Sequence, residues 1–210
     1  ITYKNAWLNL FDIPVFYFPK FFHPDPTVKR QSGFLSPTLA SSVSSNGSAI
    51  NLPYYFALSE NRDLTFKPKF YTNDNPLFQT EYRHVTKNTK TLIDFSYNEG
   101  YKNNSSKKSS GSRNHLFATS DIDLNFDSFD TSELKVKLQK VNNDTYLRVH
   151  NIKSDENLIS SYTQLNSAIN LKLKKESSSF DLDMNIYENL SNTNNRYEYV
   201  LPSFDYQNEL

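Results

Sequence analysis

The chain has 210 residues, and its 23 lysines and arginines are balanced by 23 aspartates and glutamates, so its formal net charge is zero. This balance gives no electrostatic reason to expect a nucleic acid partner, and the absence of cysteine excludes disulfides, thiolate metal sites and cysteine nucleophiles within the chain. Only 37% of the residues are hydrophobic, yet 15% are aromatic. This combination is typical of alternating strands, including strands with one face in lipid and the other in water.

The first 32 residues differ from the rest. The segment from Ala6 to Phe22 is dense in aromatic residues and contains Pro14 and Pro19, which favours short strands. A proline-rich connector and a polar break follow. We therefore expect one domain to end within residues 1–25, a linker over residues 26–32 and a second domain over residues 33–210. Because the chain opens at Ile1 without an initiator methionine or a signal peptide, we also expect it to be part of something longer.

From Gly33 onward, apolar and polar residues alternate with a period of two. This pattern predicts about ten antiparallel strands, each near the ~9–11 residues that cross a bilayer. Longer connectors are expected over residues 102–113 and 141–158, and no helix of useful length competes. The strands are expected at residues 33–42, 50–59, 64–71, 78–85, 93–98, 121–127, 134–139, 169–174, 180–187 and 196–206.

A soluble β-sandwich is the alternative explanation of this alternation, because its strands also have one buried and one wet face. Sandwich strands are usually about five or six residues long, whereas several of the alternating stretches are much longer. The apolar positions are also rich in Phe, Tyr and Leu from end to end, as a lipid-facing band with aromatic girdles requires. The pattern favours a membrane barrel over a soluble sheet.

One stretch is specific enough to compare with a known family. Residues 15–37 read VFYFPKFFHPDPTVKRQSGFLSP, and they resemble the junction segment of the LptD family, the lipopolysaccharide-assembly proteins of the Gram-negative outer membrane. The stretch from Leu52 to Leu58 and that from Arg62 to Pro68 resemble the next strands of that family, and the stretch from Val141 to Leu147 is similar to one of its loops.

The resemblance implies an all-β fold, in which the last strands of a periplasmic β-jellyroll precede an antiparallel outer-membrane β-barrel. The family barrel has about 26 strands, so the portion here would be incomplete. The implied partners are lipopolysaccharide, an LptE-like lipoprotein plug, a periplasmic LptA-like bridge protein and outer-membrane lipids. The junction between jellyroll and barrel would comprise Phe22, His23, Pro24, Asp25, Pro26, Lys29 and Arg30.

No arrangement of residues indicates catalysis. The four histidines are scattered without the spacing of metal ligands, and the motifs of zinc peptidases, α/β-hydrolases and P-loops are absent. Carboxylate pairs such as Asp121 and Asp123 lie two residues apart on a polar face, where they are expected to line water. We therefore expect no enzyme activity, metal or cofactor.

Two prolines lie inside the first two expected strands, where each removes a backbone donor worth about 0.5–1.5 kcal/mol. By resemblance, Pro37 and Pro53 match prolines that loosen a lateral gate, through which lipopolysaccharide leaves the lumen for the outer leaflet. The interpretation without a gate is a frayed strand end at Pro37 and a bulge at Pro53. The polar lumen would be lined by Lys67, Lys69, Glu81, Arg83, Asp94, Asp121 and Asp123.

Two other functions remain open. A generic outer-membrane porin or transporter would share the architecture and carry a different cargo. A soluble β-rich surface binding module would fold from this segment alone without detergent. We expect that it does not, because a piece of a larger barrel leaves open sheet edges.

Overall fold

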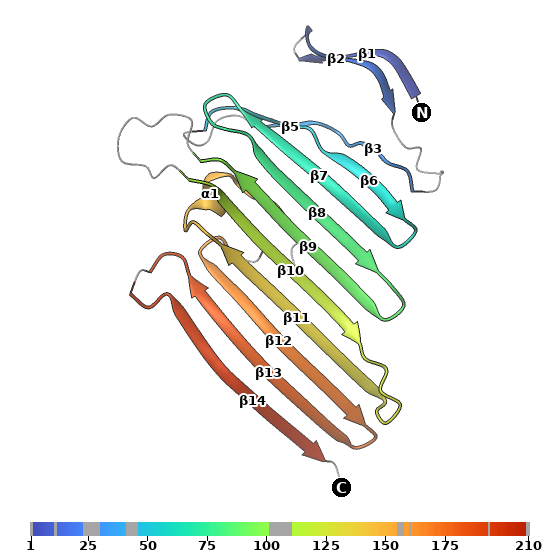
Figure 1. Cartoon of the computed structure of the whole chain (residues 1–210), viewed down its shortest axis with the longest axis vertical. Helices are drawn as coiled ribbons and strands as arrows, with labels where there is room; N and C mark the ends of the chain where they lie inside the picture. The colour runs from blue at the N-terminus through green and yellow to red at the C-terminus, as the bar shows by residue number, and fades with distance from the viewer. Residues whose placement is uncertain are drawn as a thin grey trace.

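The computed structural model describes residues 2–10, 12–22, 30–40, 46–100, 111–154, 158–159, 161–192 and 194–208. Within these residues the fold is almost entirely antiparallel β-structure, divided between a two-stranded and a twelve-stranded sheet (Figure 1). The expected all-β, antiparallel fold class is thus confirmed. The expected domain limits at residues 25 and 32 stay a prediction, because residues 23–29 lie outside the described residues.

The two-stranded sheet is a hairpin of β1 (Thr2–Leu10) and β2 (Ile13–Phe22). These strands are longer than the short strands expected from the prolines. The ladder tolerates Pro19 because the position opposite it drops out of the pairing: Asn5 adopts a left-handed conformation, with φ of 54°, and it has no Cα partner in β2. The Asn5 side chain instead accepts a hydrogen bond of 2.7 Å from the Tyr17 hydroxyl.

The twelve-stranded sheet begins with four short strands: β3 (Gly33–Phe34), β4 (Thr38–Ala40), β5 (Ala49–Asn51) and β6 (Tyr54–Ser59). Longer strands follow one another in sequence order, each pairing with the next. They are β7 (Arg62–Tyr71), β8 (Leu77–Val85), β9 (Thr89–Asn98), β10 (Arg113–Asp123), β11 (Thr131–Val141), β12 (Gln164–Lys175), β13 (Ser178–Asn189) and β14 (Tyr197–Asn208).

The twelve segments occupy the ten strand positions expected from the alternation. β7 pairs with β6 along its first half and with β5 along its second half, so β5 and β6 are one strand interrupted in the middle. In the same way, β3 pairs with β6 and β4 pairs with β5. The remaining strands are continuous, and only the expected strand at 121–127 differs clearly, because β10 already ends at Asp123.

Each face of the sheet carries one half of the alternating pattern. On β7, Asp63, Thr65, Lys67 and Lys69 share what we call the polar face, and each lies opposite a residue of β8 that belongs to the same face. The opposite, apolar face bears large hydrophobic side chains that remain exposed. Among these are Phe56, Phe70, Phe78, Phe95, Leu116, Leu138 and Ile169.

The main core lies on the polar face, near the end of the sheet where β7, β9 and β11 finish. The segment between β11 and β12, residues 142–163, contains the short helix α1 (Tyr146–Val149) and packs there against Leu77, Leu92 and Phe117. Figure 1 shows α1 against this end of the sheet. Among the described residues, no helix is long and apolar enough to cross a membrane.

Candidate functional site

The first two strand positions are both interrupted at a proline. Pro37 separates β3 from β4, and Pro53 separates β5 from β6. Between the interruptions, one backbone contact remains, in which the Leu35 amide donates to the Pro53 carbonyl over 2.9 Å. The Leu52 amide donates to the carbonyl of Pro68 over 3.0 Å, so the second position stays attached to β7 across its break.

The pairing between these two positions is therefore short. It consists of two residue pairs between β3 and β6 and three between β4 and β5. By comparison, β10 forms nine pairs with β11, without any shift of register. Each backbone hydrogen bond contributes about 0.5–1.5 kcal/mol. The pairing between the first two strand positions, which we call the first seam, is therefore weaker than the pairing between β10 and β11.

Arg30, predicted in the junction, ties the start of the first strand position to the second and third. Its guanidinium forms an ion pair with Asp63, and it donates to the Glu60 carbonyl over 2.9 Å and to the Tyr55 hydroxyl over 2.8 Å. Arg83 of β8 reaches the same carboxylate over 2.7 Å. Asp63 thus holds two arginines from different elements, at the end of the sheet where β7 begins.

The other predicted junction residues are only partly covered. Phe22 is the last residue of β2. His23, Pro24, Asp25, Pro26 and Lys29 lie outside the described residues, so nothing tests the role predicted for them.

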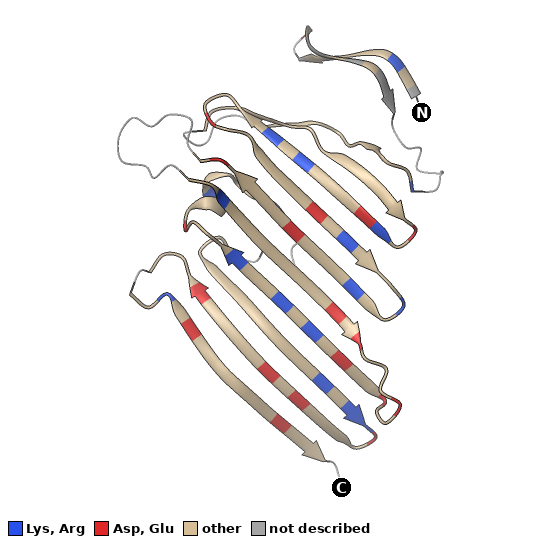
Figure 2. Cartoon of the chain, in the orientation of Figure 1, with Lys and Arg blue, Asp and Glu red and all other residues tan. Residues whose placement is uncertain are grey.

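The seven residues predicted to line a lumen lie on the polar face of the sheet. Lys67 pairs with Glu81 over 2.7 Å, and Arg83 lies 3.6 Å from Glu81 on the same strand. Asp94 is fully buried, and it accepts hydrogen bonds of 3.0 and 2.9 Å from the Gln79 side chain. Charged residues are spread over the successive strands rather than gathered in one patch (Figure 2).

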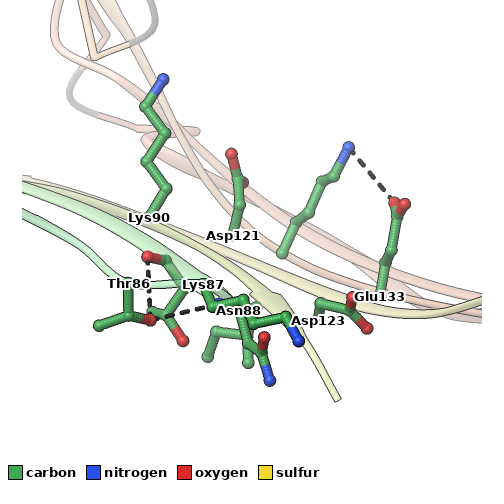
Figure 3. A pocket seen from close by; sticks show the side chains of 10 residues that line it. Thr86, Lys87, Asn88, Lys90, Asp121, Asp123 and Glu133 are labelled. Atoms are coloured by element: carbon green, nitrogen blue, oxygen red, sulfur yellow. Dashed lines mark hydrogen bonds and ion pairs between the residues drawn. The ribbon is translucent and has the colours of Figure 1, made fainter. Parts of the chain in front are cut away.

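Asp121 and Asp123 lie at the far end of the polar face, among the last residues of β10. By register Asp121 is opposite both Lys90 of β9 and Lys135 of β11. Lys90, Asp121 and Glu133 point to the same side of the sheet around an open pocket (Figure 3). Opposite charges alternate here, as expected for a surface that faces water.

The inward packing of the described residues between β11 and β12 was not predicted from the sequence. Tyr146 of α1 is fully buried, and its hydroxyl lies 2.7 Å from Ser96 Oγ, which in turn lies 2.6 Å from Nδ1 of the buried His115. Burial raises the pKa of the Tyr146 hydroxyl, so the group stays protonated. The signal available in the sequence was the set of large apolar residues inside a connector: Tyr146, Leu147, Ile152 and Leu158.

The same segment brings a second histidine onto the polar face. His150 Nδ1 lies 3.0 Å from the Tyr71 hydroxyl, and the His150 carbonyl accepts a hydrogen bond of 2.8 Å from Lys69. Burial, together with the charges of Lys69 and Arg113, lowers the pKa of His150 to about 4. The ring is therefore neutral at pH 7.

Ion pairs connect the segment after β13 to the inward segment. Arg196 pairs with Asp144 over 2.7 Å and with the largely buried Glu188 over 2.7 Å, and these contacts raise the pKa of its guanidinium. In the described part of the chain, no group of three or more His, Asp or Glu side chains is arranged to hold a metal ion.

Comparison with known proteins identifies the family. A family model described as "LptD protein" matches residues 1–209. The chain belongs to the LptD family.

Individual relatives match a smaller part of the chain. An LPS-assembly protein LptD of Psychrobacter cryohalolentis is 44% identical over 84 residues, which are 40% of this chain and 8% of that protein. Its counterpart in Ectopseudomonas mendocina is 42% identical over 92 residues, 44% of this chain and 10% of that protein. In Pseudomonas aeruginosa the identity is 36% over 96 residues, 46% of this chain and 10% of that protein. The chain spans about a tenth of the length of these relatives.

Proposed function

We propose that this chain is part of an outer-membrane translocon that inserts lipopolysaccharide into the outer leaflet, and that its first two strand positions form one side of a lateral gate. The observation that carries the proposal is the interruption of both positions at Pro37 and Pro53 beside strands that are each continuous from β7 onward. A seam with few pairs opens at a lower cost in free energy than its neighbours. Because few pairs hold the first strand to the second, the first strand would move at low cost, and the gate would open between it and the strand that closes the barrel against it.

The two faces of the sheet support a place in the membrane. Exposed aromatic and aliphatic side chains on one face suit contact with acyl chains, and the charged face suits a hydrated lumen. The longer connections, such as residues 99–112 and 142–163, leave one end of the sheet, and the short turns leave the other. By the usual asymmetry of outer-membrane barrels, the longer connections would face outward, and the hairpin of β1 and β2 would lie in the periplasm.

Transport through this structure would be passive. Acyl chains would travel along the periplasmic domain that contains β1 and β2, while the sugars would cross the polar face lined by Lys67, Lys69, Glu81, Arg83, Asp94, Asp121 and Asp123. The relatives are named LPS-assembly proteins, which supports this choice of cargo. An LptE-like lipoprotein plug in the lumen and an LptA-like bridge on the periplasmic side would complete the path.

Restoring the missing backbone donors tests the gate. In the full-length protein, replacing Pro37 and Pro53 together by alanine should strengthen the seam, because each new N–H can add about 0.5–1.5 kcal/mol of pairing. We expect lipopolysaccharide to reach the cell surface several-fold more slowly, as measured by pulse labelling and surface-specific modification. Pro76→Ala, in the connection between β7 and β8, is the matched control and should export at the normal rate.

A second variant separates the seam from the charge of the lumen. If Asp121→Lys with Asp123→Lys leaves export untouched while the proline variants slow it, the seam controls the rate and these two charges do not. Normal export by correctly assembled Pro37→Ala/Pro53→Ala protein would remove the gate from the proposal. A porin-like conduit would show no dependence of lipopolysaccharide export on any of these variants.

A further inference from the structure

A pocket of about 450 Å³ lies on the polar face directly beside the interrupted first strands. One wall comes from the seam itself, with the apolar residues Leu35, Ala40 and Pro53 beside the polar residues Thr38 and Asn51. The opposite wall comes from β7, β8 and the inward segment of residues 142–163. The pocket therefore joins the first seam of the sheet to the polar face.

The polar wall is cationic. Among the described residues, Lys67, Lys69 and Lys153 line the pocket, and no aspartate or glutamate does. Glu81 neutralises Lys67 from outside the pocket. Lys69 donates to a neutral acceptor, the His150 carbonyl, and Lys153 is close enough to repel it. The pocket wall thus carries both ammonium groups, and no carboxylate of the described residues lies on that wall to offset them.

The position of Lys153 is fixed by its backbone rather than by its side chain. Its carbonyl accepts a hydrogen bond of 3.0 Å from the Gln79 side chain, and the preceding residue, Ile152, is buried in the core. The side chain itself is exposed. The fold thus anchors the chain here and leaves the ammonium group of Lys153 available at the pocket.

We propose that this pocket binds a phosphate or carboxylate group on the sugars of lipopolysaccharide, with Lys69 and Lys153 as the cationic contacts. This inference rests on the proposed function and names the chemical group that the site takes. Anionic oxygens form strong charge-assisted hydrogen bonds with lysine, and they would relieve the repulsion between the two ammonium groups. Leu35 and Pro53 would meet an apolar part of the same molecule at the seam.

Cross-linking in the full-length protein tests the inference. A photoreactive amino acid at Asn151, which also lines the pocket, should cross-link to lipopolysaccharide in living cells. Adding Lys153→Glu should lower the cross-linking yield roughly threefold to tenfold, the loss expected for one charge-assisted contact. Because the contact that Gln79 makes is with the backbone of residue 153, the substitution leaves it in place. Lys153→Arg should keep most of the yield.

Lys137→Glu is the matched control, because Lys137 lies on the polar face of β11 outside the pocket. Its yield should equal that of the parent protein. A second arm uses purified protein in vesicles with intact lipopolysaccharide, with phosphatase-treated lipopolysaccharide, or with added inorganic phosphate. Loss of the cross-link after phosphatase treatment, with little competition from inorganic phosphate, would identify the phosphate of the glycolipid as the ligand. Competition by inorganic phosphate at millimolar concentration would reassign the site to the free ion and overturn the proposal.

The outcomes separate this inference from the proposed function. An undiminished yield in Lys153→Glu, in protein that assembles normally, would overturn the charged site. A cross-link from a probe at Thr119 but none from Asn151 would also overturn the pocket, while lipopolysaccharide would still cross the polar face. If no position on that face cross-links to lipopolysaccharide, the proposed function itself fails.

Discussion

At the scale of single residues, Asp63 connects the junction residue Arg30 to the large sheet. Its side chain is 4% exposed and faces two arginines, each 46% exposed. A buried carboxylate is costly unless it is paired, so Asp63 is stable in this position only while Arg30 and Arg83 remain beside it. Because Arg30 precedes the first strand, the contact fixes one end of that strand independently of its short ladder. The seam is therefore weakest in its middle, around Pro37, while the end near Arg30 stays attached.

Asp63→Ala should lower the thermal stability of the assembled full-length protein. Removing the carboxylate leaves two guanidinium groups next to each other, and we expect a loss of about 1–3 kcal/mol, less than for a fully buried pair because the arginines are half exposed. The temperature at which the folded band disappears in a heat-modifiability gel measures the effect. Arg62→Gln is the control, because Arg62 is exposed at the same turn, and it should change little. Equal melting temperatures for Asp63→Ala and the parent would mean that the ion pairs contribute nothing to stability.

At the scale of elements, the sequence predicted the strands of the large sheet well and one connector poorly. The alternation of apolar and polar residues predicted the strands from β7 to β13, apart from the limits of β10, because successive residues of each strand face two different environments. It placed Lys67, Glu81 and Asp121 on one face from local pattern alone. The interruptions at Pro37 and Pro53 were also predictable, since proline removes a donor wherever it lies.

The inward packing of residues 142–163 was not predictable in the same way. Its apolar residues have neither a period of two nor a helical period, and their partners lie on several different strands. Leu77, Leu92 and Phe117 occupy polar-face positions, where a single strand gives no reason for an apolar side chain. Only the tertiary contact explains them, because each fills the space beneath the connector. The cationic pocket also depends on this contact, since His150, Asn151, Ile152 and Lys153 form part of its wall.

The inward segment should loosen in mild acid. The pKa of His150 is about 4 in the folded protein and near 6.5 in an unfolded segment, so the unfolded segment binds more protons between these values. Its stability is therefore complete above pH 6.5 and is lost as the pH falls towards 4, by an amount on the order of 2 kcal/mol at pH 5. Hydrogen exchange of residues 145–153, corrected for the intrinsic rate at each pH, should show faster local opening at pH 5 than at pH 7. The groups facing His150 are Tyr71, Lys69 and Asn46.

His150→Asn serves as the control for this prediction, because it removes the titrating ring and keeps a polar side chain. Its opening rate should differ little between the two pH values. If the parent protein shows the same corrected exchange at pH 5 and pH 7, the buried ring does not hold the segment in place. A variant with the same acid response as the parent would assign the effect to another group.

At the scale of the whole molecule, the large sheet is amphipathic across its entire width. One side carries the charged residues and is partly covered by the inward segment, whereas the other side exposes large apolar residues on nearly every strand. On β14, the outermost strand of the described sheet, Leu201, Phe204 and Tyr206 are at least 66% exposed. Contiguous exposed apolar surface of this kind is rare in soluble monomers. The sheet therefore needs a lipid phase or further strands to cover both its apolar face and its edges.

The 210-residue chain on its own should accordingly not remain folded and monomeric in plain buffer. We expect it to aggregate after refolding by dilution, and to recover antiparallel β-structure with fixed aromatic packing only when detergent is present above its critical micelle concentration. Size-exclusion chromatography with light scattering, combined with far- and near-ultraviolet circular dichroism, measures both properties. The same dilution with detergent below the critical concentration is the control, since it changes the solution without supplying micelles. A sharp monomer peak in buffer, with cooperative thermal unfolding and the exposed phenylalanines protected from solvent, would show that the apolar face packs within the chain and not against lipid.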